Sequence, residues 1–400
     1  MPIALLALTL SAFAIGTTEF VIVGLLPTIG ADLGVDLPSA GLLVSLYALG
    51  VAIGAPVLTA LTGKVPRKFL LLSLMVLFTL GNLLAWQAPS YESLVLARIV
   101  TGLAHGVFFS IGSTIATSLV PKEKAASAIA IMFTGLTVAL VTGVPLGTFI
   151  GQHFGWRETF LAVSALGIVA FIGSLIYVPN NIAHSKPASL LQQLQVLKQP
   201  RLLLVYAMTA IGYGGSFIAF TFLAPILQDI SGFSAGAVSL VLLVYGISVA
   251  AGNIWGGKLA DKRGPISALK IIFALLAAVL FLLTLTAANP WLALATVLVW
   301  GAVAFGNVPG LQVYVVRQAE HHTPQAVDVA SGLNIAAFNL GIAGGAWAGG
   351  LIVAHMGLIH TAWIGGLVVL VALALTAWSG RLDRLGPVYA ESSTRVVAGN

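Results

Sequence analysis

Three ionisable side chains lie inside segments that are otherwise apolar: Glu19, Arg98 and His105. A charge near the middle of a bilayer costs at least about 2.5 kcal/mol on insertion scales, so an acid there indicates a function and a partner. A carboxyl group can bind and release a proton, and a nearby cation or apolar wall changes how strongly it holds that proton. We therefore interpret Glu19 as a proton-binding group that Arg98 and His105 tune. The alternative is that Glu19 only bridges two helices through hydrogen bonds.

The two bases share one face of a predicted helix, because Arg98, Gly102, His105 and Gly106 follow helical spacing. At 1.5 Å per residue, Arg98 lies roughly 8 Å and His105 roughly 18 Å from the outer end of that helix, and Glu19 lies at roughly 12 Å in its own helix. One acid can therefore reach either base if the two helices are neighbours. The alternatives are a snorkelling anchor for Arg98 and a packing role for His105.

The composition is that of a polytopic membrane protein. Of the 400 residues, 59% are hydrophobic and 8% are charged, which would leave large apolar patches on a soluble domain of this length. The absence of cysteine excludes disulfides and thiolate metal sites. We find no phosphate loop, metal cluster or nucleophile motif, so we expect no cofactor and no enzymatic activity. The net charge of +6 is attributed to cytoplasmic loops rather than to nucleic-acid binding.

Twelve apolar windows are long enough to cross a hydrocarbon core about 30 Å thick. The predicted fold is therefore an all-α membrane protein with twelve transmembrane helices. The windows fall at 4–28, 40–62, 69–87, 93–119, 125–151, 158–178, 202–228, 236–257, 268–287, 291–315, 326–354 and 359–379.

The distribution of cations predicts the orientation of these spans. If the N-terminus is cytoplasmic, every one of the 18 Lys and Arg residues except Arg98 and Arg157 falls at the cytoplasmic side. Cytoplasmic loops carry an excess of Lys and Arg. We therefore expect a multi-pass protein of the bacterial inner membrane, with both termini in the cytoplasm.

The chain divides into two similar halves. The longest loop, 179–201, separates six spans from six, and its residues 189–198 have the leucine spacing of an interfacial amphipathic helix. A shift of 198 residues aligns Tyr47 with Tyr245 and Gly54 with Gly252, and a shift of 202 aligns Gly155 with Gly357. We expect two pseudo-symmetric six-helix bundles, residues 1–180 and 202–380, joined by a cytoplasmic linker, 181–201, and followed by a tail, 381–400. Such duplication with a site at the interface is typical of transporters, and we expect a monomer.

Two basic loops occupy equivalent places in the halves. The second reads Gly257-Lys258-Leu259-Ala260-Asp261-Lys262-Arg263-Gly264, and the first carries Lys64, Arg67 and Lys68 with Gly63 where the acid would stand. An acid beside bases in a tight turn can bridge two helix ends and release them, as a conformational latch would. The alternative is an ordinary solvated basic loop.

The fifth span carries Gly143, Gly147 and Gly151 at intervals of four, with Pro145 among them. The glycines give one smooth face for close helix packing, and the proline removes a backbone hydrogen bond and bends the helix. A plain packing groove is the alternative.

Substrate contacts are expected from neutral groups, since the second half has no charged residue in the middle of a helix. Aromatic walls with few amides suit a neutral or amphipathic solute, although aromatic stripes also occur as simple packing. The candidates are Thr18, Tyr213, Phe217, Trp300, Asn307, Asn334 and Asn339.

These motifs resemble those of the major facilitator superfamily, and within it the twelve-spanner drug:proton antiporters. The run Gly257–Gly264 resembles the superfamily's loop signature, Arg98-x-x-x-Gly102 its fourth-helix signature, and Gly143–Gly151 the antiporter signature. The segment starting at Thr17-Thr18-Glu19-Phe20 is most similar to the bacterial sugar-efflux branch, also called arabinose efflux permeases. The resemblance implies the major facilitator fold and proton-coupled export. Gly63 and Val144 depart from the usual signatures.

The sequence thus predicts a secondary transporter that exports a small neutral or amphipathic solute, such as a sugar or drug, in exchange for protons across the bilayer. Glu19 would carry the proton, and Lys64–Lys68 with Gly257–Gly264 would gate the cytoplasmic side. A proton symporter or a facilitator for uptake remains an alternative. A membrane-embedded receptor or enzyme is a remote one.

Overall fold

The computed structural model describes residues 2–121, 124–182 and 190–385. Within these ranges the chain is helical and has no strand, and twelve helices are long and apolar enough to span a membrane. The predicted fold class is therefore confirmed. Parts of the predicted linker and tail, together with Lys122, Lys186 and Arg395, lie outside the described residues.

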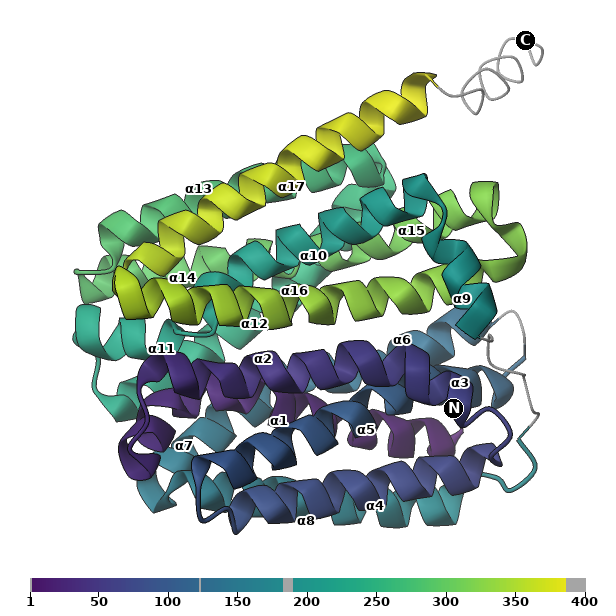
Figure 1. The fold of residues 1–400 in the computed structure, drawn as a ribbon, viewed down its shortest axis with the longest axis horizontal. Helices are drawn as coiled ribbons and strands as arrows, with labels where there is room; N and C mark the ends of the chain where they lie inside the picture. Colours follow the sequence, from purple (N-terminus) through teal and green to yellow (C-terminus); the bar gives the residue numbers. More distant parts are fainter. Residues whose placement is uncertain (1, 122–123, 183–189, 386–400) are drawn as a thin grey trace.

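Six spans form the first half of the molecule, drawn in the lower part of Figure 1. Several of them consist of consecutive helical segments. The segments are α1 (Ile3–Leu33), α2 (Leu37–Ile53), η1 (Gly54–Leu58), α3 (Thr59–Leu61), α4 (Arg67–Trp86), α5 (Tyr91–Ser118), α6 (Ala125–Val138), η3 (Ala139–Gly143), α7 (Val144–Phe154) and α8 (Trp156–Tyr177).

Six further spans form the second half, drawn above the first (Figure 1). Its segments are α9 (Leu190–Leu197), α10 (Pro200–Phe220), α11 (Leu223–Pro225), η4 (Ile226–Ile230), α12 (Ala235–Arg263), α13 (Pro265–Thr286), α14 (Pro290–Ala304), α15 (Asn307–His322), η5 (Pro324–Ala326), α16 (Val327–His355) and α17 (His360–Leu385). We call the end of the molecule where α1 begins and α17 ends the termini end, and the opposite end the far end.

Four spans are interrupted, one of them at Pro145, where the sequence predicts a bend. The segments η1, η3 and η4 are π-helical, and each lies beside a proline: Pro56 within η1, Pro145 just after η3 and Pro225 just before η4. A proline lacks the N–H that would continue the regular ladder, so the backbone changes its hydrogen-bond register there. The fourth interruption separates α14 from α15 at Phe305 and Gly306.

Glycines bring pairs of helices into backbone contact. A Cβ atom added to Gly252 of α12 would lie 1.8 Å from the carbonyl oxygen of Ala302, and one added to Gly256 would lie 2.0 Å from that of Gly306. In the first half, a Cβ on Gly102 of α5 would lie 2.3 Å from the carbonyl oxygen of Tyr47. Small residues permit this approach in membranes, where no hydrophobic force drives helices together. The crossings α2–α5 and α12–α14 are thus built alike in the two halves.

The two halves touch each other at the far end. The Ser45 hydroxyl of α2 donates a hydrogen bond to the Ala343 carbonyl of α16 at 2.7 Å. The ring of Phe222, which is fully buried, lies between Gly41 and Gly349, close enough that a Cβ on either glycine would approach it within 3 Å. On the other side, Ser239 of α12 donates to Gln152 of α7 at 3.3 Å. The far end is therefore closed by direct contacts between the halves.

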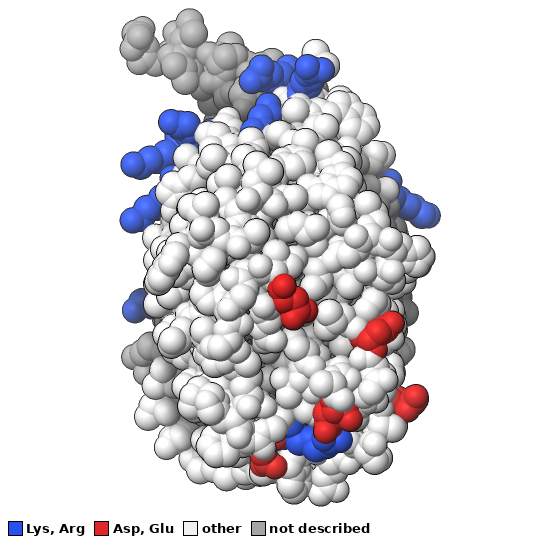
Figure 2. All heavy atoms as spheres, turned by 90° about the vertical axis from the view of Figure 1, so that its left-hand side faces the viewer, with Lys and Arg blue, Asp and Glu red and all other residues white. Residues whose placement is uncertain are grey.

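Charge is segregated between the two ends. The far end carries Asp32, Asp36, Glu92, Glu158 and Asp229, and Arg157 is the single Lys or Arg that the structure describes there. Figure 2 shows this face, with acidic side chains across it and most Lys and Arg side chains beyond its rim. Arg157 donates to the Asp32 carboxylate at 2.5 Å and to the Ala88 carbonyl at 2.9 Å. Arg157, which lies at the end opposite to most Lys and Arg residues, is thus held by an ion pair within the first half.

The glycine crossing in the second half is expected to be sensitive to a single added methyl group. Gly252→Ala places that group against a backbone carbonyl, so the helices must separate, and overpacking of this kind costs about 1–3 kcal/mol. The matched control is Gly332→Ala on α16, where a Cβ would meet nothing within 4 Å. We expect Gly252→Ala to lower the melting temperature in detergent and Gly332→Ala to leave it unlowered. Equal melting temperatures would contradict the close crossing.

Candidate functional site

Glu19 lies in the middle of α1 and is 7% exposed. Its carboxylate Oε2 is 3.9 Å from Nδ1 of His105 on α5. The same Nδ1 atom is 3.0 Å from the hydroxyl of Tyr47 on α2, which makes a hydrogen bond to it. An acid, an imidazole and a phenol from three helices therefore meet in the interior of the first half.

Arg98 is 1% exposed and does not extend to the membrane surface. Its Nη1 donates to the Thr18 carbonyl at 2.7 Å, its Nη2 to the Glu19 carbonyl at 3.4 Å and its Nε to the Leu43 carbonyl at 3.3 Å. The guanidinium also lies 4.0 Å from the centre of the Tyr47 ring, in a cation–π contact. The interpretation of Arg98 as a snorkelling anchor is therefore wrong.

The arginine is bound by backbone carbonyls rather than by the Glu19 carboxylate. Among the described residues, the carboxylate of Glu19 has an ion-pair contact within 4 Å with His105 and none with Arg98. Three carbonyl dipoles and an aromatic face neutralise much of the guanidinium charge. Glu19 is thus near a cation without being tied to it in a direct salt bridge.

Local packing fixes these side chains. The contact of Gly102 with the Tyr47 backbone brings α2 against α5, which places the Tyr47 ring between Arg98 and His105. On the other side of α1, the π-helical segment η3 ends at Gly143, where a Cβ would lie 2.1 Å from the Thr17 hydroxyl oxygen. π-helical turns are frequent at functional sites. The helix that carries Glu19 is therefore held closely on both sides.

Two polar residues at this site were missed in the sequence analysis. The repeat contains Tyr47 but does not predict it as a site residue, and the sequence motifs do not include Asn82. The Thr18 hydroxyl, a predicted substrate contact, donates instead to the Asn82 side chain at 2.6 Å. The sequence does carry one signal for them, because each is a polar side chain inside an apolar span. Polar groups in spans are ambiguous without knowledge of which helices are neighbours.

The predicted aromatic residues of the second half form a cluster that reaches the first half. Tyr213 packs on Phe217 with ring centres 5.1 Å apart, and on Phe305 and Phe338 at 5.4 and 5.0 Å. Phe20, the neighbour of Glu19, packs on Phe217 at 6.4 Å. The aromatic wall is therefore continuous with the helix that carries the acid.

The other predicted substrate contacts are mostly engaged within the protein. The Trp300 indole donates to the Ser216 hydroxyl at 3.0 Å, and the Asn307 amide donates to the Ala304 carbonyl at 2.8 Å. The Asn339 amide donates to the Ile335 carbonyl at 3.1 Å. The side-chain carbonyl oxygens of Asn307 and Asn339 are buried and accept no hydrogen bond. Two acceptors are therefore left for a solute or for water.

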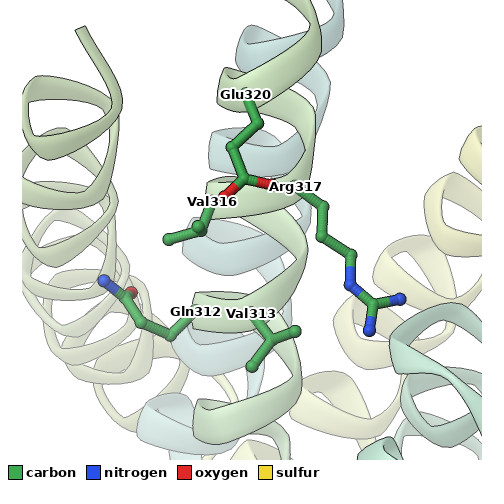
Figure 3. Close-up of a pocket in the computed structure, with 5 residues that line it drawn as sticks. All are labelled: Gln312, Val313, Val316, Arg317 and Glu320. Atoms are coloured by element: carbon green, nitrogen blue, oxygen red, sulfur yellow. The ribbon is translucent and has the colours of Figure 1, made fainter. Parts of the chain in front are cut away.

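Asn334 belongs to a polar chain that ends at a pocket on α15. Its amide donates to the Gln312 side chain at 2.9 Å, and its own carbonyl oxygen accepts from Thr209 at 2.7 Å. The pocket has a volume of about 360 Å³, and Figure 3 shows the side chains of α15 that line it. It is lined by Gln312, Val313, Val316, Arg317 and Glu320.

The predicted gating residues lie at the termini end. Asp261, Lys262 and Arg263 are exposed, and Asp261 has no ion-pair partner among the residues that the structure describes. Arg67, by contrast, is 3% exposed. The structure therefore does not bring Asp261 together with a base.

A family model described as Major Facilitator Superfamily matches residues 8–329. The chain belongs to this superfamily. Over 381 residues it is 56% identical to YtbD, an uncharacterized MFS-type transporter of Bacillus subtilis (strain 168). This match covers 95% of this chain and 96% of the relative. It is 43% identical to the inner membrane transport protein YdhP of Escherichia coli (strain K12), over 88% of each chain.

A third relative bears on the predicted branch. The chain is 35% identical to a probable sugar efflux transporter of Pasteurella multocida (strain Pm70), over 87% of this chain and 85% of the relative. Among solved structures, an inward-facing, occupied bacterial homologue of the human lysosomal transporter Spinster superposes with a TM-score of 0.75. Its identity is 17%, and the match covers 94% of this chain and 96% of that chain, so it supports the fold.

These relatives confirm the predicted family and the sugar-efflux branch. The chain is a membrane transporter of the major facilitator superfamily and not an enzyme. Its twelve spans and its relatives make it a multi-pass protein of the bacterial inner membrane, with a small-molecule substrate.

The hydroxyl of Tyr47 is expected to matter because it binds His105 beside Glu19. Tyr47→Phe keeps the ring over Arg98 and removes that hydrogen bond, which typically contributes about 0.5–1.5 kcal/mol. The matched control is Tyr245→Phe, the repeat-related tyrosine, whose buried hydroxyl has no hydrogen-bond partner among the described residues. We expect Tyr47→Phe to lower the melting temperature and to displace the pH dependence of transport. If the two variants behave alike, the Tyr47–His105 contact has no role in the site.

Proposed function

We propose that this transporter exports a small neutral or amphipathic solute in exchange for protons, and that Glu19 binds the proton. The observation that carries the proposal is the environment of Glu19: a buried carboxylate beside His105, next to a cation that is held by backbone carbonyls. A carboxylate without a salt bridge in an apolar interior can take up a proton, and one that a cation approaches can release it. Arg98 and His105 would tune this exchange.

The energy for export would come from the movement of protons down the membrane potential, given the proposed orientation. The termini end carries nearly all the Lys and Arg residues, so we assign it to the cytoplasm. Each proton that moves inward then releases about 2.3 kcal/mol per 100 mV. Export of a solute against its gradient can use this energy. The relative named as a probable sugar efflux transporter supports export as the direction.

The two halves would act as two bodies around one central site. In this assignment the transporter is a monomer, and its halves, residues 1–180 and 202–380, move relative to each other. The contacts at the far end close the site to the outside. The aromatic cluster of Phe20, Tyr213 and Phe217 would line the site. The unpaired acceptors of Asn307 and Asn339 would bind hydroxyl or amide donors of the solute. The glycine groove at Gly143–Gly151 packs against α1, where Cβ atoms would collide with Thr17, Val21 and Leu25.

The first test removes the proton-binding group and keeps its volume. In proteoliposomes with an imposed pH gradient, Glu19→Gln is expected to abolish coupled accumulation of radiolabelled arabinose or chloramphenicol, whichever the wild type transports. Downhill exchange of the same probe should persist. The control is Glu92→Gln, an exposed acid at the far end.

A substrate-independent measurement addresses the same carboxyl. Glu19 is the buried acid among the described residues, so a pH titration by infrared difference spectroscopy should show a buried carboxyl band that Glu19→Gln removes. Wild-type coupled transport in Glu19→Gln, or a spectrum that the substitution leaves unchanged, would refute the role of Glu19.

The second test concerns the proposed latch. Asp261 would pair with the bases Lys64–Lys68 or with a neighbouring helix end when the termini end closes, so Asp261→Asn should favour the present arrangement. A latch worth about 1–3 kcal/mol, the usual range for coupling between sites, would change the ratio of the two states roughly 5- to 150-fold.

The measurement is the distance between spin labels at Phe69 of α4 and Arg381 of α17, two exposed positions on opposite halves of the termini end. The control is Asp328→Asn on α16, a second acid at this end that the motif does not include. An unchanged distance distribution in Asp261→Asn, with unchanged transport, would reduce Gly257–Gly264 to an ordinary basic loop.

A further inference from the structure

The short helix α9 (Leu190–Leu197) lies at the termini end and contacts both halves of the transporter. Its neighbours are α10 and α16 in the second half and η1 in the first half. In Figure 1 it lies crosswise to the long helices at the termini end. Because the long helices cross the membrane, a helix crosswise to them lies along its surface.

One face of α9 is fixed to the second half. Val196 is 1% exposed and belongs to an apolar core that contains residues of both halves, and α9 contacts α10 and α16 of the second half. A turn at Lys198 and Gln199 leads directly into α10. There Arg201 forms an ion pair with Asp383 of α17. Because Tyr314 of α15 also donates to the Asp383 carboxylate, at 2.9 Å, the start of α10 is tied to two other spans, and α9 should move with the second half.

The same helix makes a polar contact with the first half. The Gln193 side chain donates from Nε2 to the carbonyl oxygen of Pro56 at 3.1 Å. Pro56 lies in η1, the π-helical segment where the second span changes its hydrogen-bond register. The contact therefore crosses between the halves at the termini end, where the predicted latch residue Asp261 has no partner among the described residues.

The outward face of α9 presents two leucines, and an exposed lysine follows in the turn at its end. Leu191 is 66% exposed and Leu194 is 56% exposed, and Lys198 is also exposed. The spacing of three places the two leucines along one stripe of the helix. Burial of these two leucines in lipid would remove their apolar surface from water, which is favourable. A lysine at the edge of such a stripe can reach an anionic headgroup while its alkyl stem stays on apolar surface.

We propose that α9 is a membrane-docked strap: Leu191 and Leu194 insert into the cytoplasmic leaflet, Lys198 binds anionic lipid headgroups, and Gln193 ties the helix to the first half. The strap favours the arrangement that the structure shows, with the far end closed. The anionic leaflet is the occupant because the same end of the molecule carries the exposed cations Lys64, Lys258 and Lys262. The proposal rests on the two-body movement described under the proposed function, but the docking itself needs no transport.

The docking is tested with single-cysteine spin labels, which the cysteine-free chain permits without background. Labels at Leu191 and Leu194 in vesicles of phosphatidylcholine and phosphatidylglycerol should be accessible to oxygen and shielded from a water-soluble nickel chelate. A label at Lys262 provides the water-exposed reference. Lys198→Gln should weaken the shielding, and vesicles of pure phosphatidylcholine should do the same. Labels at Leu191 and Leu194 that are as accessible to the chelate as the one at Lys262 would overturn the docking.

The strap is tested by the distance between labels at Phe69 and Arg381. Gln193→Ala should increase the population with a shorter distance at the termini end by about 2- to 10-fold, the range expected for the loss of one hydrogen bond. Leu191→Gln combined with Leu194→Gln should act in the same direction in anionic vesicles. The control is Leu61→Gln, another leucine of this end that is 67% exposed but lies on α3.

The outcomes separate this inference from the proposed function. If Gln193→Ala leaves the distance distribution unchanged while Asp261→Asn changes it, the halves alternate without a strap, and the strap is refuted. If Glu19→Gln transports normally but labels on α9 are shielded by lipid and Gln193→Ala shifts the distances, the strap stands and the proton role of Glu19 fails.

Discussion

The burial of one guanidinium charge organises the first half of this transporter. Arg98 of α5 donates to carbonyls of α1 and α2 and lies over the ring of Tyr47. An uncompensated charge in this interior would cost several kcal/mol, so the three helices are constrained to bring those carbonyls together. The same constraint leaves the Glu19 carboxylate without a strong ion pair. In the proposed function, this arrangement leaves the carboxylate free to exchange a proton while the arginine stays bound to backbone carbonyls.

Comparison of the halves shows that the duplicated framework carries different chemistry. The shift of 198 residues that pairs Tyr47 with Tyr245 also pairs Glu19 with Phe217. Tyr47 binds a histidine, whereas Tyr245 stacks on Phe220 with ring centres 5.1 Å apart, and its hydroxyl has no partner. The framework of glycine crossings is common to both halves. We therefore assign the ionisable chemistry to the first half and the aromatic surface to the second.

The number of spans and the family were predictable because hydrophobic length and basic loops are properties of the local sequence. The similar depths of Glu19 and His105 were also predictable, since helical rise fixes the depth of each residue, whereas the packing of their two helices against each other was an assumption. Three features were not. The carbonyl ligands of Arg98 depend on which backbone atoms lie opposite. The role of Tyr47 depends on the neighbour of α2. The π-helical segments depend on how each proline is accommodated, because a proline in a span permits a kink, a break or a change of register.

The glycine crossings have a mechanical consequence. At Gly102 and at Gly252 the contact is between backbones, so no side chain can change rotamer to absorb a displacement. A contact of this kind has little compliance, and two helices joined by it rotate together about the crossing point. We therefore expect the α2–α5 and α12–α14 pairs each to move as one rigid unit in any rearrangement of the transporter.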